Sequence, residues 1–302
     1  IAGLPMPILA VRPTVTEIEP VEHNGFDLSN SIIPMLEIFS GGPPKDGIPA
    51  ILNPTFVSAD TDQGFDDGDI VLSFSHNGES RAYPLNIIVH HEIVNDEIGG
   101  IPVAVTYCPL CGTSMVFDRR YEGETLSFGV SGLLHNSDVL MYDHQTESLW
   151  SQLKMQSISG EKVNTVLRWL PSTEMTLGAW RERYPEGEVL SRDTGYRRNY
   201  DGGAYAKYMS SPRLMSPVAI VRWELGLKDW VIGIKIDENT KAYPLSMLKT
   251  MESPTLTDTL GETQIVIHFD VDSGATTVEN MGNREIIPHV KLYWFAWQAF
   301  YP

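Results

Sequence analysis

The chain has 302 residues, of which 42% are hydrophobic and 20% are charged, as in soluble globular proteins. Its formal net charge of −17 argues against nucleic acid and against an anionic membrane surface as partners, because both require clustered Lys and Arg. No stretch approaches the roughly 20 apolar residues of a membrane span.

The chain begins at Ile1 without an initiating Met, and the first residues contain neither a basic region nor an apolar signal core. Two explanations stay open. Either a signal or membrane anchor that preceded Ile1 has been removed, or the sequence is that of a shortened protein. A single pair of cysteines does not decide the redox compartment.

Residues 1–50 are rich in Pro and Gly and predict an N-terminal extended arm, with the strongest break at Gly41-Gly42-Pro43-Pro44. Only the segment from Ile32 to Phe39 has an ordered pattern. We favour an arm that packs on its own domain. The alternative is an arm that adds to a neighbouring subunit and so forms a homo-oligomer. Residues 51–302 are predicted to form a single globular unit.

The segment 69–85 predicts two short strands joined by a turn, with Pro84 at the first turn of a helix. This helix is expected to carry the adjacent histidines His90 and His91 and to turn back from Asp96 onwards. A strand then leads directly to the only two cysteines of the chain.

Further along the chain, the segment from Ser172 to Tyr184 predicts a helix that Pro185 ends. The aromatic and apolar stretch from Val290 to Trp297 is expected to be buried. With 20 prolines and 25 glycines, the composition favours an α+β fold that is predominantly antiparallel β with a few short helices. Three further strands are expected between the cysteines and Ser172, over residues 126–129, 139–142 and 148–153.

An internal repeat relates two parts of the chain. We predict that the fold is built from two pseudo-repeats, the first over about 51–215 and the second over about 216–302. The matched stretches are 69–85 with 229–245, at an offset of 160, and 103–107 with 265–269, at an offset of 162.

The second offset matches the cysteine turn with a turn that lacks sulfur. A glycine is shared, which predicts that both turns need an unusual backbone angle. Any thiol chemistry would then belong to the first pseudo-repeat alone. The matched pairs are Cys108 with Asp270, Cys111 with Ser273, and Gly112 with Gly274.

Cys108 and Cys111 stand in the sequence Tyr107-Cys108-Pro109-Leu110-Cys111-Gly112, for which three interpretations are open. A metal-binding turn is favoured, because Pro stiffens the turn and Gly lets both thiolates face one ion. A redox dithiol normally lies at a helix N-terminus, whereas residues 112–117 predict a strand. A structural disulfide would close so short a loop that it would stabilise the fold only slightly.

The remaining ligands must come from other side chains, because the chain has only one Cys-x-x-Cys turn. His91 is the first candidate, since its helix can lie beside the cysteine turn. On a helix, the side chain of His90 would point about 100° away from that of His91, so His90 is a secondary candidate. His135 and Met141 are further secondary candidates. Two thiolates plus one imidazole suit copper or zinc, and an added methionine would favour copper.

Seven short motifs together resemble the family known as domain of unknown function 3179. The resemblance covers about Asn53 to the C-terminus and implies no activity. It implies bacterial or archaeal proteins that are often exported or membrane-anchored, so an extracytoplasmic location, periplasmic or at the cell surface, is expected. His91 lies inside one of the motifs, which ranks it above His90. The motifs are Ala82-Tyr83-Pro84-Leu85, His91-Glu92-Ile93-Val94-Asn95-Asp96, Tyr107-Cys108-Pro109-Leu110-Cys111-Gly112-Thr113, Gly132-Leu133-Leu134 with Met141-Tyr142-Asp143, Leu149-Trp150-Ser151-Gln152 and Trp294-Phe295-Ala296-Trp297.

The sequence thus predicts a metal-binding protein of unassigned activity, with a mixed Cys/His site for one copper or zinc ion. Cys108 and Cys111 would be thiolate ligands and His91 an imidazole ligand, with the last position unassigned. The first alternative is a thiol-disulfide oxidoreductase that uses the two cysteines. The second is a structural or self-assembling surface protein that uses the N-terminal arm. Whether the protein is an enzyme stays open.

Overall fold

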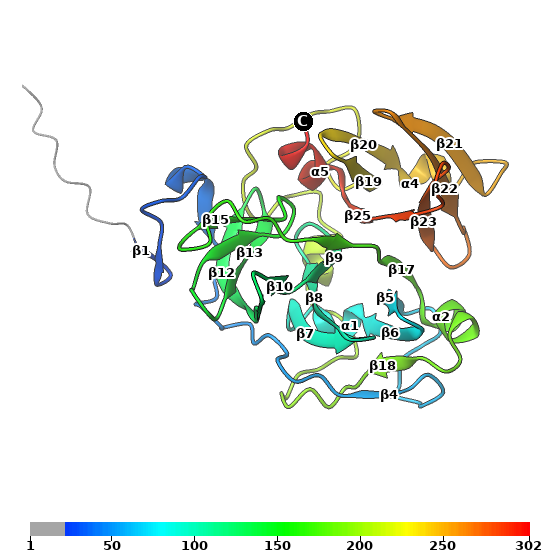
Figure 1. Ribbon diagram of the computed structural model, residues 1–302, viewed down its shortest axis with the longest axis horizontal. Helices are drawn as coiled ribbons and strands as arrows, with labels where there is room; N and C mark the ends of the chain where they lie inside the picture. The colour runs from blue at the N-terminus through cyan, green and yellow to red at the C-terminus, as the bar shows by residue number, and fades with distance from the viewer. Residues whose placement is uncertain (1–21) are drawn as a thin grey trace, which may run out of the picture.

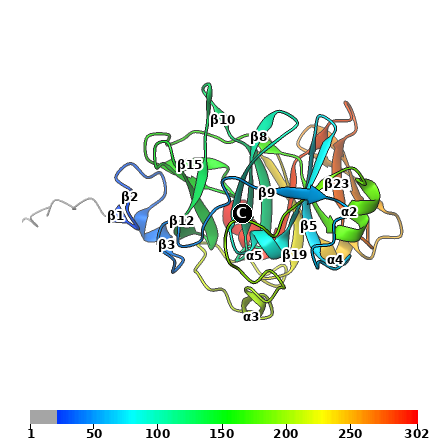
Figure 2. The same cartoon turned by 90° about the horizontal axis from the view of Figure 1, so that it is seen from below.

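The computed structural model describes residues 22–302, in which short strands form seven sheets and helices are few (Figure 1). Nearly all strand pairs in this part of the chain are antiparallel, the exception being one short parallel pair at Glu188 and Val189. The predicted fold class, mostly antiparallel β with a few short helices, is confirmed. Both views place the first strands at one end of the molecule and the sheet of residues 255–287 at the other (Figures 1 and 2).

The sheet that carries Cys108 lies in the middle of the molecule and has four strands in the order β16-β9-β8-β7. A five-stranded sheet, β15-β14-β13-β12-β3, packs beside it through contacts between β12 and β7. The bounds of these strands are β3 (Ile38–Ser40), β7 (Ile93–Ile98), β8 (Ile101–Cys108), β9 (Thr113–Asp118), β12 (Phe128–His135), β13 (Asp138–Asp143), β14 (Leu149–Ser151), β15 (Gln156–Ser159) and β16 (Trp169–Leu170).

A second five-stranded sheet has the order β17-β5-β6-β18-β4, and two further sheets, β20-β19-β25 and β21-β22-β23-β24, follow along the chain. Their strands are β4 (Phe56–Ser58), β5 (Ile70–His76), β6 (Glu79–Pro84), β17 (Thr173–Thr176), β18 (Glu188–Leu190), β19 (Trp230–Ile236), β20 (Asn239–Pro244), β21 (Thr255–Leu260), β22 (Thr263–Phe269), β23 (Thr276–Asn280), β24 (Ile286–Ile287) and β25 (His289–Tyr293).

Two small hairpins and the helices complete the described part of the chain. No helix of residues 22–302 is both long and apolar enough to span a membrane. The remaining elements are β1 (Glu22–His23), β2 (Phe26–Asp27), β10 (Arg120–Tyr121), β11 (Glu124–Thr125), η1 (Met35–Glu37), α1 (Leu85–Ile88), α2 (Leu177–Arg183), α3 (Ala206–Met209), α4 (Leu245–Leu248) and α5 (Trp294–Phe300).

The described part of the N-terminal arm packs on the rest of its own chain. Strand β3 pairs with the end of β12, and the side-chain amide of Asn24 donates to the Ser131 carbonyl at 2.6 Å. Burial of Phe26 and Leu28 anchors the segment to the β12–β13 sheet. From residue 22 onwards the segment thus contacts the β12–β13 sheet of its own chain, while residues 1–21 of the predicted arm lie outside the described residues. The arm as a separate part of the chain, and its role in self-association, stay predictions.

The C-terminal aromatic stretch is buried, as expected. Trp294 is 7% exposed, Phe295 is 0% exposed and Trp297 is 3% exposed, and all three belong to the hydrophobic cluster that contains both cysteines. Burying an aromatic side chain of this size contributes roughly 2–3 kcal/mol. Helix α5 therefore closes the core against which the cysteine turn is held.

The helix expected after Pro84 is much shorter than predicted. Helix α1 ends at Ile88, and the residues from Ile93 onwards form strand β7. The reason is that Ile93 and Val94 are β-branched and find hydrogen-bonding partners in β8, which a helix would leave unpaired. The two histidines consequently lie in the turn between α1 and β7.

Two other boundaries differ from expectation. The helix predicted from Ser172 begins at Leu177, because Thr173–Thr176 pair with the edge of β5 as strand β17. The strand predicted to end at Gly129 continues as β12 to His135, so His135 ends a buried strand and does not lie in a polar loop. In both cases an available sheet edge extends the strand beyond what local sequence suggests.

The elements of the two matched stretches follow one another in the same order. Strands β5 and β6 with helix α1 are followed later by β19 and β20 with helix α4, and both glycines of the matched turns have a positive φ, 65° at Gly112 and 75° at Gly274. The unusual backbone angle expected for both turns is thereby confirmed. The division into two pseudo-repeats and into the predicted domains stays a prediction.

Candidate metal centre

The two cysteines lie at a tight turn between two fully buried strands. Cys108 is the last residue of β8 and pairs with Thr113, the first residue of β9. The turn between them needs Gly112, because its φ is 65° and an added Cβ would lie 2.4 Å from the Trp230 ring. The Tyr293 N–H donates to the Cys111 carbonyl at 2.9 Å, which ties the turn to the C-terminal core.

A second turn brings a carboxylate to the same place. Strands β12 and β13 are joined by the two-residue turn Asn136-Ser137, and both residues have a positive φ, as hairpin turns of this length require. The Ser137 carbonyl lies 3.1 Å from the Cys111 Sγ and 3.7 Å from the Cys108 Sγ. Asp138 follows immediately and directs its side chain into the same cluster.

Cys108, Cys111 and Asp138 together could hold a metal ion. One ligand atom of each residue lies within 4.8 Å of the other two, and all three residues are buried. Within residues 22–302 no other group of His, Cys, Asp or Glu side chains meets this criterion. The cysteines are free thiols, so their sulfurs are available as ligands.

Burial of the cluster disfavours the ionised forms of its acidic groups. Burial raises the pKa of Asp138 to about 7 and holds the pKa of the Cys111 thiol well above its ordinary value. One oxygen of Asp138 accepts from the Leu153 N–H at 2.9 Å, while its Oδ1 is buried without a partner. Among the described residues no basic side chain forms an ion pair with Asp138.

Glu92 adds a fourth acidic group to this region. It follows His91 in the turn before β7, its φ is 58°, and it is only 6% exposed. Burial, with a smaller contribution from the negative charge of Asp138, raises the pKa of Glu92 to about 8. Glu92 and Cys108 both line a cavity of about 30 Å³, which is enough for one water molecule or one ion.

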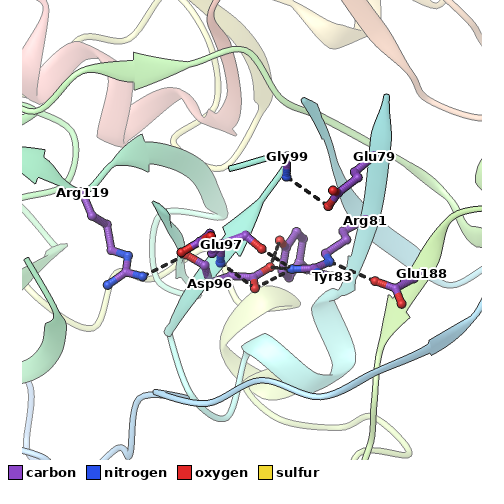
Figure 3. A network of polar contacts seen from close by, with 8 residues as sticks. All are labelled: Glu79, Arg81, Tyr83, Asp96, Glu97, Gly99, Arg119 and Glu188. Atoms are coloured by element: carbon purple, nitrogen blue, oxygen red, sulfur yellow. Dashed lines mark hydrogen bonds and ion pairs between the residues drawn. The ribbon is translucent and has the colours of Figure 1, made fainter. Parts of the chain in front are cut away.

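The strand that follows Glu92 is held by a network of charged and polar side chains on β6, β7 and β18, together with Arg119 just after β9 (Figure 3). Arg81 donates to both oxygens of Asp96, at 2.6 and 2.7 Å, and the Tyr83 hydroxyl donates to the same carboxylate at 2.6 Å. Arg119 donates to the Asp96 carbonyl at 2.9 Å. Because Arg81, Tyr83 and Arg119 each donate to an acceptor on β7, the strand and the turn before it are fixed relative to the sheet.

His91, the predicted imidazole ligand, is engaged elsewhere. Its Nδ1 lies 2.7 Å from the Pro49 carbonyl and its Nε2 lies 2.6 Å from the Tyr200 hydroxyl, so both ring nitrogens have protein partners. Burial lowers the pKa of His91, which keeps the ring neutral. The structure therefore places Asp138, and not His91, with the two thiols.

The secondary candidates are also found outside the group of Cys108, Cys111 and Asp138. The His90 Nε2 is buried without a hydrogen-bond partner, and the ring packs edge-on against Tyr200. His135 lies with its Nε2 3.5 Å from a Glu37 oxygen. Met141 is a fully buried core residue on β13. None of these side chains belongs to the group of three that lies within ligand distance.

Two acidic residues of the site were not predicted from sequence. The hairpin that positions Asp138 is visible as two apolar runs separated by His135-Asn136-Ser137, but nothing local indicates that it meets the cysteine turn. Glu92 lies inside the His91–Asp96 motif and gives no separate signal. Asp138 and Glu92 become candidate site residues only when the packing of the sheets places them near the cysteines.

A comparison with known families matches residues 45–287 to the family described as protein of unknown function (DUF3179). The chain belongs to this family. The match includes both cysteines, Glu92 and Asp138, and it ends before the aromatic residues Trp294–Trp297. No curated protein matches the chain, and no solved structure matches it.

Proposed function

We propose that this protein binds one transition-metal ion through Cys108, Cys111 and Asp138. The observation that carries the proposal is the burial of three acidic groups within 4.8 Å of one another, without a basic partner among the described residues. Uncompensated buried charges are expensive, and a coordinated cation removes that cost. Metal binding then also contributes to folding, because the ion joins the β8–β9 turn to the β12–β13 hairpin.

The donor set favours zinc over copper. Zinc accepts thiolate and carboxylate ligands together, whereas a copper site would be expected to use imidazole or thioether ligands as well. Asp138 supplies a hard oxygen, while His91 has both ring nitrogens in hydrogen bonds and Met141 is not part of the cluster. Copper remains the alternative that metal analysis decides.

The fourth position is proposed to face the cavity that Glu92 and Cys108 line. A water held there could bridge the ion and the Glu92 carboxylate, or Glu92 could bind the ion itself after a side-chain rotation. Either arrangement would offset the cost of ionising the buried Glu92, because a nearby cation stabilises the carboxylate and lowers the pKa that burial raises.

The thiol-disulfide alternative is favoured by one observation, the closeness of two free cysteines. Their burial disfavours it, since Cys108 is 1% exposed and Cys111 is 0% exposed, and a substrate thiol cannot reach them without opening the core. The raised pKa of Cys111 also leaves little thiolate at neutral pH.

We further propose that the sulfur-free turn at Asp270–Gly274 is the structural counterpart of the metal turn. Support comes from a polar network that recurs in the second stretch, where Tyr243 donates to Asp258 at 2.8 Å and Lys241 pairs with the same carboxylate at 2.5 Å. In the first stretch, Tyr83 and Arg81 contact Asp96 in the same way. The second turn would keep the backbone shape without binding metal.

Metal analysis of the purified chain, without added metal, tests the proposal. We expect about one equivalent of zinc in the unmodified protein and less than about a tenth of an equivalent in Cys108→Ser and Asp138→Asn. The matched control is Asp270→Asn, which removes a carboxylate at the equivalent place of the second turn and should leave the metal content unchanged.

Two results would contradict the proposal. One is a chain without zinc, copper or iron that gains none on dialysis against these ions. The other is a metal content that Cys108→Ser and Asp138→Asn leave intact. If the metal-free protein also forms a Cys108–Cys111 disulfide reversibly under mild oxidation, the thiol-disulfide alternative replaces the metal site.

A further inference from the structure

A cleft that shares no residue with the cysteine turn lies where β5, β16 and β17 face β23, β24 and β25. Its volume is about 420 Å³, within the range of pockets that bind small organic molecules. Strand β17 pairs with β5 and contacts both β23 and β25, so the two sides of the cleft are held at a fixed separation. Figure 1 shows β17 running between these strands.

The charge of the cleft is opposite to that of the molecule. Three arginines line it, Arg120, Arg168 and Arg183, and no Asp or Glu does, although the chain has 39 acidic and only 22 basic residues. Arg168 and Arg183 are exposed and form no ion pair within residues 22–302. Unpaired guanidinium groups around a concave surface attract and orient anions.

The inner part of the cleft offers a polar group without a partner. Thr276 is 3% exposed, and its Oγ1 is buried without a hydrogen bond, although its backbone N–H donates to the Thr173 Oγ1 at 3.0 Å. Thr173 and the buried His289 line the cleft beside it. A buried hydroxyl without a partner destabilises the fold, and a ligand oxygen that pairs with it would remove that cost.

The remaining lining combines small polar residues with apolar and aromatic ones. Leu170, Ile286 and Tyr184 contribute to the walls, and His76 stacks on Phe74 with the ring planes 4° apart. Such walls provide binding energy for an apolar group but none for a hydrated inorganic ion. The cleft therefore combines a cationic rim, one polar group inside and apolar walls.

We propose that this cleft binds a small organic anion, with its carboxylate or phosphate on the arginines and its apolar body between β5 and the β23–β24 hairpin. The site shares no residue with the cysteine cluster, so the inference is independent of the proposed metal binding. An anionic group can accept two hydrogen bonds from one guanidinium, which fixes its orientation.

Calorimetric titration of the full chain tests the proposal with probes that differ in one property. The anions are 2-naphthoate and 1-naphthyl phosphate, the neutral analogue is 2-naphthamide, and inorganic phosphate lacks the apolar body. At least one naphthyl anion should bind with a Kd below about 1 mM, and its affinity should fall as salt is added. The naphthamide and inorganic phosphate should bind at least about ten times more weakly.

The double variant Arg168→Gln/Arg183→Gln should weaken binding of the naphthyl anion at least about tenfold, because it removes the two unpaired guanidinium groups that would donate charged hydrogen bonds to the anion. Arg213→Gln removes an exposed arginine outside the cleft and should leave the affinity unchanged. Three results overturn the proposal: no binding of either naphthyl anion below about 1 mM, equal binding of naphthoate and naphthamide, or equal binding to the double variant and Arg213→Gln.

Discussion

At the scale of single residues, the site depends on two buried carboxyl groups that are costly without a cation. One carboxyl oxygen of Asp138 accepts a hydrogen bond from the Leu153 N–H, and the other is buried without a partner. The carboxyl group lies close to both sulfurs. Glu92 keeps a positive φ that non-glycine residues rarely adopt. Such strain persists where the surrounding structure enforces it, as it does at binding sites.

The role of Glu92 can be separated from those of the direct ligands. Glu92→Gln keeps the shape of the side chain but removes its charge, so we expect it to retain a metal ion and to weaken zinc binding about 10–100-fold. Competition with a chromophoric chelator measures the affinity. The control is Glu97→Gln, an exposed glutamate on strand β7, which follows Glu92. Equal affinities of the two variants would remove Glu92 from the site.

At the scale of elements, two turns bring the proposed ligands together. The β8–β9 turn carries the sulfurs and the β12–β13 hairpin carries the carboxylate, and each is held by contacts outside its own sheet. The Tyr208 hydroxyl donates to the Leu110 carbonyl at 2.8 Å, and the Asn136 amide oxygen accepts from the Ala219 N–H at 2.8 Å. The long segment between β18 and β19 therefore supports both turns.

Alanine substitutions at the matched glycines Gly112 and Gly274 measure how tightly Trp230 packs against the cysteine turn. Gly112→Ala places a Cβ 2.4 Å from the Trp230 ring in addition to its strained φ, whereas Gly274→Ala meets nothing within 4 Å. We expect losses in the free energy of unfolding of about 2–4 kcal/mol and about 1 kcal/mol respectively. Urea unfolding measures both. Equal losses would show that Trp230 does not restrict the turn.

The sequence predicted those elements whose pattern is local. The alternating apolar runs around Cys108 form the expected strands, and the stretch around Phe295 is buried because no surface could accommodate so many aromatic side chains. The turn at Gly112 was also predicted, since glycine next to Cys-x-x-Cys indicates a positive φ. These features follow from a few neighbouring residues.

The sequence did not predict features that depend on packing between distant segments. Strand β7 exists because β8 offers a partner, although the residues around His91 also suit a helix. Asp138 is 27 residues beyond Cys111, and only the packing of two sheets makes them neighbours. His91 was a reasonable ligand by type and distance along the chain, but Pro49 and Tyr200 occupy both of its nitrogens.

At the scale of the whole molecule, the sheet that carries Cys108 also reaches the basic cleft, through Ile101 on β8 and Leu170 on β16, and β25 lines the cleft with His289. This strand joins the two parts of the fold, since it pairs with β19 and also contacts β17 and β9. His289 begins β25 and is only 5% exposed, so its protonation affects the stability of the entire chain.

Stability should fall in mild acid because of His289. Burial lowers its pKa from 6.5 to about 4, so between these values the unfolded chain binds a proton that the folded chain does not. Unfolding is then favoured as pH falls from 7 to 5, by about 2 kcal/mol from this residue. In urea unfolding, the stability that His289→Gln loses between pH 7 and pH 5 should be smaller by this amount. The control His144→Gln changes an exposed histidine and should lose as much stability as the unmodified chain. Equal pH dependence in all three proteins would contradict the assignment.

X-ray absorption at the edge of the bound metal tests the central claim most directly, because it reports the ligand atoms themselves. The account predicts a zinc ion with two sulfur ligands at about 2.3 Å and oxygen ligands at about 2.0–2.2 Å, and the loss of one sulfur in Cys108→Ser protein reloaded with zinc. A spectrum with only nitrogen and oxygen ligands, or one that Cys108→Ser leaves unchanged, would contradict it.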